Sequence, residues 1–170
     1  LAKPLVTILL TEKWLPCVPL IQILCFARML TPLSAINMNL LNAIGRPDLF
    51  MKVDLSKIPF ELIILIITIP MGVKAIVIGN LISTIICFFI NTYYPQKIFG
   101  YGGIQQLKDS FKIFIALIFM SATSYISTLV FENPIAKLII GGIVGIIIYL
   151  ISCSIFKIIN FRVIFNYIKN

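Results

Sequence analysis

The chain has 170 residues, of which 60% are hydrophobic and only 12% are charged, whereas an ordinary globular domain is about 45–50% apolar and about 25% charged. A soluble fold of this size cannot hide so much apolar surface from water, so the composition excludes a soluble domain. The net charge of +8 comes from basic residues that lie between apolar runs rather than on one contiguous face. This pattern favours anionic membrane lipid as their partner, and we expect no nucleic-acid binding.

The apolar runs predict an all-α, polytopic transmembrane helix bundle, because a helix that crosses a bilayer needs about 20 mostly apolar residues. Residues 1–10 are expected to be the end of a truncated span, since the chain begins at Leu1 without a signal peptide and reads as the C-terminal part of a longer protein. We therefore expect the missing N-terminal part to be a partner. About five spans follow, over residues 15–44, 51–71, 73–94, 111–131 and 134–156.

Glycine and proline are expected to end these spans. Gly45-Arg46-Pro47-Asp48 is a turn signal after the first span, and Pro70-Met71-Gly72 separates the second from the third. Tyr94-Pro95 is expected to end the third span. Glu132-Asn133-Pro134 is a tight link between the fourth and the fifth.

The basic residues also predict the orientation, because they are enriched in cytoplasmic loops. Most of them lie in the loops after the first and third spans and in the tail: Arg46, Lys52, Lys57, Lys97, Lys108, Lys112, Lys157, Arg162 and Lys169. The opposite side has Lys13, Lys74 and Lys137. We therefore expect a cytoplasmic C-terminus.

The last part of the chain divides into three predicted segments. Residues 96–112 are expected to be a cytoplasmic loop in which residues 104–112 form a short helix on the membrane surface. Residues 113–156 would supply two extra C-terminal spans. Residues 157–170 combine basic and aromatic side chains, and this basic cytoplasmic tail is either an interfacial helix or a frayed end.

The first span contains the sharpest candidate for a functional residue, Arg28. A buried arginine costs about 2.5–3.5 kcal/mol at the centre of a membrane helix, so it needs a partner. At about 100° per residue, one helix face presents Arg28, Thr31, Ala35, Asn39 and Asn42, which predicts a surface that lines the bundle interior. Pro32 cannot donate to the carbonyl of Arg28 and predicts a kink there. The guanidinium either binds a phosphate-bearing substrate or forms a structural pair.

Glu61 is an acidic residue inside the second predicted span, two residues after Pro59. It has three readings: a partner of Arg28 across antiparallel helices, a protonation site for ion coupling, or a residue that reaches the membrane interface because the helix starts late. The sequence leaves these alternatives open.

A narrow polar stripe runs along the third span, where Asn80, Thr84, Cys87 and Asn91 recur at helical spacing. It either packs against a neighbouring helix or lines a cavity. The fifth span contains Gly141-x-x-x-Gly145, which permits close approach of another helix. The sequence has no histidine, metal-ligand spacing, nucleophile elbow or phosphate loop, so it predicts neither an enzyme nor a metal or cofactor site.

Several short motifs occur in order along the first two thirds of the chain: TEKWLP at residues 11–16, PLIQIL at 19–24, LNAIGRPD at 41–48, PMG at 70–72, GY at 100–101 and QLKD at 106–109. In this order and spacing the set resembles the C-terminal lobe of bacterial polysaccharide repeat-unit flippases. These are the Wzx-type exporters of O-antigen, capsule and exopolysaccharide, within the MATE-like multidrug/oligosaccharidyl-lipid/polysaccharide superfamily. Residues 113–170 match only as further spans.

The resemblance implies that residues 11–95 belong to the C-terminal lobe of a two-lobed flippase in the bacterial inner membrane. It implies transport of an undecaprenyl-pyrophosphate-linked oligosaccharide, with H⁺ or Na⁺ as a possible coupling ion. Residues expected to line the substrate cavity are Arg28, Thr31, Asn39, Asn42, Glu61, Asn80, Thr84 and Asn91. The alternatives are a cation-coupled multidrug exporter of the MATE family and an inactive truncated membrane protein.

Overall fold

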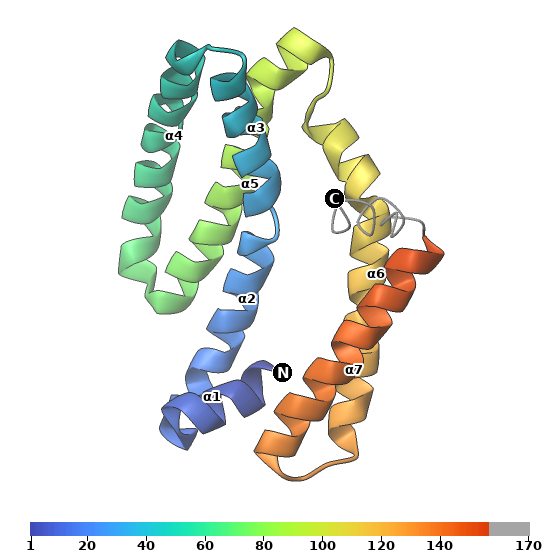
Figure 1. The fold of residues 1–170 in the computed structure, drawn as a ribbon. Helices are drawn as coiled ribbons and strands as arrows, with labels where there is room; N and C mark the ends of the chain where they lie inside the picture. Colours follow the sequence, from blue (N-terminus) through green and yellow to red (C-terminus); the bar gives the residue numbers. More distant parts are fainter. Residues whose placement is uncertain (157–170) are drawn as a thin grey trace. The chain divides into compact units, whose positions relative to one another are not determined.

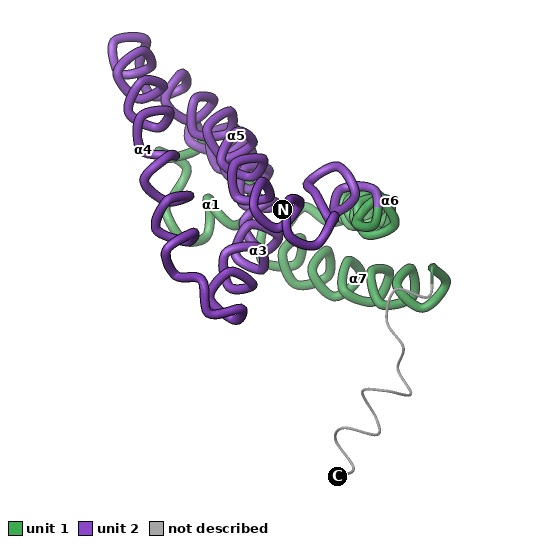
Figure 2. Tube along the Cα trace, turned by 90° about the horizontal axis from the view of Figure 1, so that it is seen from above, with its two compact units in different colours: residues 1–15, 109–170 green, residues 16–108 purple. Residues whose placement is uncertain are grey.

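The computed structural model describes residues 1–156, and the predicted tail over residues 157–170 lies outside the described part. Within residues 1–156 every element is a helix, in agreement with the predicted all-α bundle (Figure 1). The chain divides into two compact units, which Figure 2 colours separately. Unit 1 consists of residues 1–15 and 109–170, and unit 2 of residues 16–108.

Unit 2 begins with two short helices that share the first predicted span. These helices are α2 (Val18–Arg28) and α3 (Thr31–Ala43), each with a proline in its first turn. A 3-10 helix, η1 (Glu12–Cys17), precedes α2 directly. The backbone N–H of Met29 donates to the carbonyl of Phe26 at 3.2 Å, a tighter turn than an α-helix makes. The predicted kink beside Arg28 is therefore confirmed, because Pro32 has no N–H to continue the ladder.

Two long helices complete unit 2. They are α4 (Pro47–Thr68), extended by the 3-10 turn η2 (Ile69–Met71), and α5 (Val73–Phe99). The turns between α3 and α4 and between η2 and α5 use Gly45 and Gly72, whose φ angles of 71° and 90° favour glycine. A small core of Met38, Leu41, Leu49 and Val53 joins α3 to α4, and Phe50, Ile90 and Tyr94 pack against it.

Within residues 1–156, three α-helices belong to unit 1 in whole or in part: α1 (Ala2–Leu10), α6 (Gly103–Leu129), which passes from unit 2 into unit 1, and α7 (Pro134–Ile155). The α6–α7 link has Asn133 as the helix cap, whose side chain accepts from the N–H of Ile135 at 2.9 Å. The predicted close approach at the Gly141-x-x-x-Gly145 motif is confirmed. Gly141 and Gly145 are buried, and the Ser124 hydroxyl of α6 donates to the Gly141 carbonyl at 2.8 Å.

Two predicted boundaries were wrong. The third span does not end at Tyr94-Pro95, because α5 continues through Pro95 and ends at Gly100, which has a left-handed φ of 70°. A proline removes one backbone hydrogen bond, and the helix absorbs that loss. The separate surface helix over residues 104–112 is also absent, since these residues form the first turns of α6. The predicted loop over residues 96–112 shrinks to a short connection around Tyr101.

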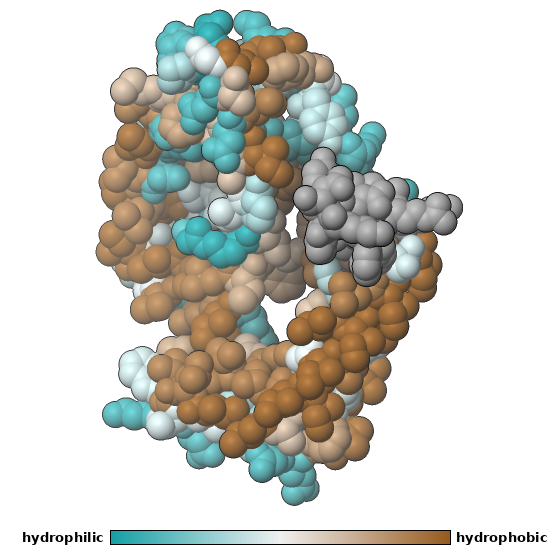
Figure 3. Space-filling model, in the orientation of Figure 1, coloured by the Kyte–Doolittle hydropathy of each residue, from teal (hydrophilic) through white to brown (hydrophobic). Residues whose placement is uncertain are grey.

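Among the described residues, four helical segments are long and apolar enough to cross a membrane: Glu12–Ala43, Val73–Phe99, Gly103–Leu129 and Pro134–Ile155. The second predicted span is a helix, but α4 carries Lys52, Asp54, Lys57 and Glu61 and is not among these four segments. Figure 3 shows hydrophobic residues over α7 and the lower part of α4, and hydrophilic residues at the turn between α3 and α4 and midway along unit 2. This surface suits a lipid environment.

Candidate functional site

A partly open polar cavity of about 480 Å³ lies within unit 2. Its walls come from α2 and α3 on one side and from α4 and α5 on the others. The polar and charged residues that line it are Arg28, Thr31, Ser34, Lys57, Glu61, Thr68, Asn80, Ser83, Thr84, Cys87 and Asn91.

Six of the eight predicted cavity residues line this cavity: Arg28, Thr31, Glu61, Asn80, Thr84 and Asn91. The other two, Asn39 and Asn42, are exposed and do not line it. The predicted face assumed one continuous helix, whereas the structure divides it into α2 and α3 at Met29 and Leu30. Asn39 and Asn42 therefore do not share this cavity with Arg28 and Thr31.

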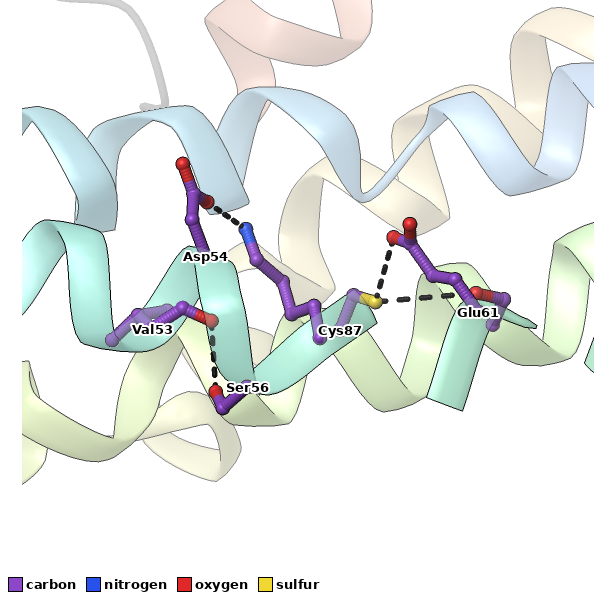
Figure 4. A network of polar contacts seen from close by, with 7 residues as sticks. Val53, Asp54, Ser56, Glu61 and Cys87 are labelled. Carbon is purple, nitrogen blue, oxygen red and sulfur yellow. Dashed lines mark hydrogen bonds and ion pairs between the residues drawn. The ribbon is translucent and has the colours of Figure 1, made fainter. Parts of the chain in front are cut away.

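The cavity contains both signs of charge. The Cys87 thiol donates to Glu61 Oε1 at 3.4 Å, and Figure 4 shows these two side chains facing one another from α5 and α4. Lys57 forms an ion pair with Asp54, one turn earlier on α4. Within the described residues Arg28 forms no ion pair, so the structural Arg28–Glu61 pair is not formed, although both residues line the same cavity.

The polar stripe of α5 is only partly satisfied by its own helix. The Thr84 hydroxyl donates to the Asn80 carbonyl at 2.8 Å. The side-chain oxygens of Asn80 and Asn91 are buried and have no hydrogen-bond partner among the described residues, and Asn91 is only 4% exposed. A buried acceptor without a partner costs about 1–3 kcal/mol. Asn80 and Asn91 also line the polar cavity, so these two buried amide oxygens lie beside it.

Prolines add backbone acceptors beside the same cavity. Pro32 follows Arg28 by four residues, and Pro95 follows Asn91 by four residues. Since proline has no N–H, it cannot make the i to i−4 bond that each of these carbonyls would otherwise accept. Arg28 and Asn91 thus lie where the helical hydrogen-bond ladder lacks one donor.

Sequence reasoning missed two polar groups. Asn37 and Gln106 are buried and exchange reciprocal hydrogen bonds, at 2.8 Å and 2.7 Å, that join α3 to the first turns of α6. Their separation of 69 residues gives no local signal. Lys57 was also overlooked as a cavity residue, although it precedes Glu61 by four residues and therefore shares its helix face.

The helices, their apolar surfaces and the polar cavity define an all-α membrane protein with transmembrane helices. The sequence is 31% identical over 160 residues to MJ1068, an uncharacterized membrane protein of the archaeon Methanocaldococcus jannaschii. The match covers 92% of this chain and 31% of that protein, so the chain spans about a third of the relative's length. No protein-family profile matches the chain, and no solved structure matches it significantly.

Proposed function

We propose that the chain is part of a transporter that moves lipid-linked oligosaccharide repeat units across the cell membrane for surface polysaccharide biosynthesis. One observation carries the proposal. A polar cavity opens in a bundle whose outer surface is apolar, and it contains a guanidinium that forms no ion pair within residues 1–156. Polar groups inside membrane bundles mark substrate or ion pathways. The relative's description as a membrane protein is compatible with this class and carries no information on its substrate.

The chemistry of the cavity suits the two parts of such a substrate. Arg28 presents a planar fork of donors that binds a pyrophosphate with two parallel hydrogen bonds. The amide oxygens of Asn80 and Asn91 and the Glu61 carboxylate accept hydrogen bonds from sugar hydroxyls. Eleven residues of α5 separate the two asparagines, which is about 16 Å of helix, so an extended glycan rather than a single small group fits this row of acceptors.

The remaining features of the proposal follow from the resemblance to the Wzx-type flippases. The chain would supply part of the C-terminal lobe, and the rest of the same protein would supply the opposite wall of the cavity. We propose a multi-pass protein of the bacterial inner membrane with a cytoplasmic C-terminus, an undecaprenyl-pyrophosphate-linked substrate and coupling to H⁺ or Na⁺. The protein would act as a transporter and not as an enzyme.

A second candidate function is cation-coupled drug export, as in the MATE family. The observation in its favour is Glu61, a carboxylate in the cavity wall that forms no ion pair among the described residues. A drug exporter would depend on this carboxylate and would tolerate loss of Arg28, because cationic drugs gain nothing from a guanidinium. An isolated C-terminal part that lacks the opposite wall would be inactive.

The test uses the full-length protein in proteoliposomes loaded with a fluorescent pyrophosphate-linked oligosaccharide. Arg28→Ala should lower the flipping rate about 10- to 100-fold, the factor that corresponds to the loss of a charged hydrogen bond of about 1.5–3 kcal/mol. Arg28→Lys should retain part of the activity, since it keeps the charge without the fork. Lys97→Ala, at an exposed position outside the cavity, is the matched control. Normal flipping by Arg28→Ala would reject the proposed role of this residue.

A further inference from the structure

A second hollow, of about 520 Å³, lies between α4 and α5 and shares no lining residue with the polar cavity. We call it the α4–α5 groove. Its walls include Lys52, Ser56 and Phe60 of α4 and Phe89 and Tyr93 of α5. Apart from Lys52 and Ser56 the groove is lined by aromatic and aliphatic residues, which gives it the polarity of a site for an amphiphile.

The groove is graded in polarity from one end to the other. Lys52, Ser56 and Phe60 recur every four residues, so they form one face of α4 that changes from cationic to apolar over about 12 Å. Helix α5 runs antiparallel to α4 along the groove: Tyr94, near the end of α5, packs on the core that contains Leu49 and Val53, near the start of α4. The tyrosine end of α5 therefore lies beside the lysine end of α4.

The charge of Lys52 is not neutralised by the acids around it. Asp48 accepts two hydrogen bonds from Arg46, each at 3.0 Å, and Asp54 is paired with Lys57. Within the described residues Lys52 takes part in no ion pair. A free ammonium group at one end of an apolar groove complements an anionic headgroup, and a buried polypeptide segment would instead have to bring an acid to this position.

The aromatic residues support a position at the membrane interface. The rings of Tyr93 and Tyr94 contact one another edge to face, with centroids 5.2 Å apart. Tyr93 is 59% exposed, although it lies beside a groove. Tyrosine and lysine gather where hydrocarbon meets headgroups, because each combines an apolar body with a polar tip.

We propose that the α4–α5 groove binds one anionic phospholipid. The phosphate lies at the Lys52 ammonium, with the tyrosine hydroxyls beside it, and one acyl chain follows the groove toward Phe60 and Phe89. The site is separate from the cavity assigned to the transported substrate, and the proposal does not depend on what that substrate is. A lipid at this position would fix the spacing of α4 and α5, which form two walls of the polar cavity.

The test is native mass spectrometry of the full-length protein released from nanodiscs that contain equal amounts of phosphatidylglycerol and phosphatidylcholine. The wild-type protein should retain one phosphatidylglycerol in preference to phosphatidylcholine. Lys52→Gln should reduce this preference about fivefold, in line with the contribution of one basic side chain at an anionic surface. Lys97→Gln removes a charge near the same end of α5 but outside the groove and should leave the preference unchanged.

A second variant separates the acyl-chain contact from the charge. Phe89→Ala shortens an exposed side chain and should weaken retention of both lipids while the protein stays folded. A photoreactive p-benzoylphenylalanine at position 89 should cross-link to lipid. The proposal is overturned if Lys52→Gln and Lys97→Gln bind phosphatidylglycerol like the wild type, or if the cross-link joins position 89 to polypeptide, which would mean that protein covers the groove.

Discussion

The α6–α7 hairpin allows a prediction with an internal control, because two adjacent glycines of α7 have different surroundings. A methyl group on Gly141 would lie 2.9 Å from Thr128 Cγ2 of α6 and 2.8 Å from Leu1 Cδ2. A methyl group on Gly142 would meet nothing within 4 Å. Gly141→Ala should therefore destabilise the protein relative to Gly142→Ala.

The size of the effect follows from how easily the neighbours move. The end of the Leu1 side chain is flexible, but Thr128 is held in its rotamer because its hydroxyl donates to the Tyr125 carbonyl at 2.6 Å. Overpacking of this kind costs about 1–3 kcal/mol. If the helices separate instead, the Ser124–Gly141 hydrogen bond is lost, at about 0.6 kcal/mol. The gain in helix propensity, about 1 kcal/mol for each glycine replaced, cancels between the two variants.

The measurement is the free energy of unfolding of the full-length protein in mixed micelles, followed through an SDS titration. We expect Gly141→Ala to be less stable than Gly142→Ala by about 1–3 kcal/mol, with the wild type between them or close to the Gly142 variant. Equal stability of the two variants would refute the close packing of α7 on α6 at Gly141.

Two further predictions concern polar contacts of unit 2. In a double-mutant cycle, Asn37→Ala and Gln106→Ala should show a coupling energy of about 1 kcal/mol in the same unfolding assay. The control is Asn39→Ala, at an exposed position, which should change the stability little. Additive effects of Asn37→Ala and Gln106→Ala would contradict the reciprocal amide pair. The Arg46 guanidinium holds the pKa of the Asp48 carboxyl below its usual value, so this pair stabilises the fold above the normal aspartate pKa and loses its effect as the pH falls through the lowered pKa. Asp48→Asn should therefore reduce the acid-induced loss of melting temperature between pH 5 and pH 3, and an unchanged acid profile would show that other carboxylates cause it.

Helix positions were largely predictable because each depends on local chemistry. Gly45 and Gly72 adopt positive φ angles where turns were expected, and Pro134 opens α7 as the Glu132-Asn133-Pro134 signal indicated. The two wrong boundaries have different causes. Pro95 weakens α5 without ending it, because the neighbouring turns still favour the helix. Residues 104–112 are more polar than the span that follows, but polarity alone does not interrupt a helix.

The polar cavity was predictable wherever one unbroken helix carried the pattern. Asn80, Thr84 and Asn91 share a face of α5, and the structure places all three at the cavity. The pattern across α2 and α3 was less informative: Arg28 and Thr31 line the cavity, whereas Asn39 and Asn42 do not. Which part of a polar face lies at a cavity depends on the neighbouring helices, so it cannot be read from spacing alone.

The sequence by itself determined that the helices lie in a lipid bilayer and that the fold is all-α. The reason is that hydrophobicity summed over about 20 residues does not depend on which helix packs against which. It also indicated which faces are polar. Only the tertiary structure decided the pairings, such as Asn37 with Gln106, Cys87 with Glu61 and Ser124 with Gly141. These contacts join residues on different helices, so they depend on the rotation and spacing of packed helices, which no local pattern encodes.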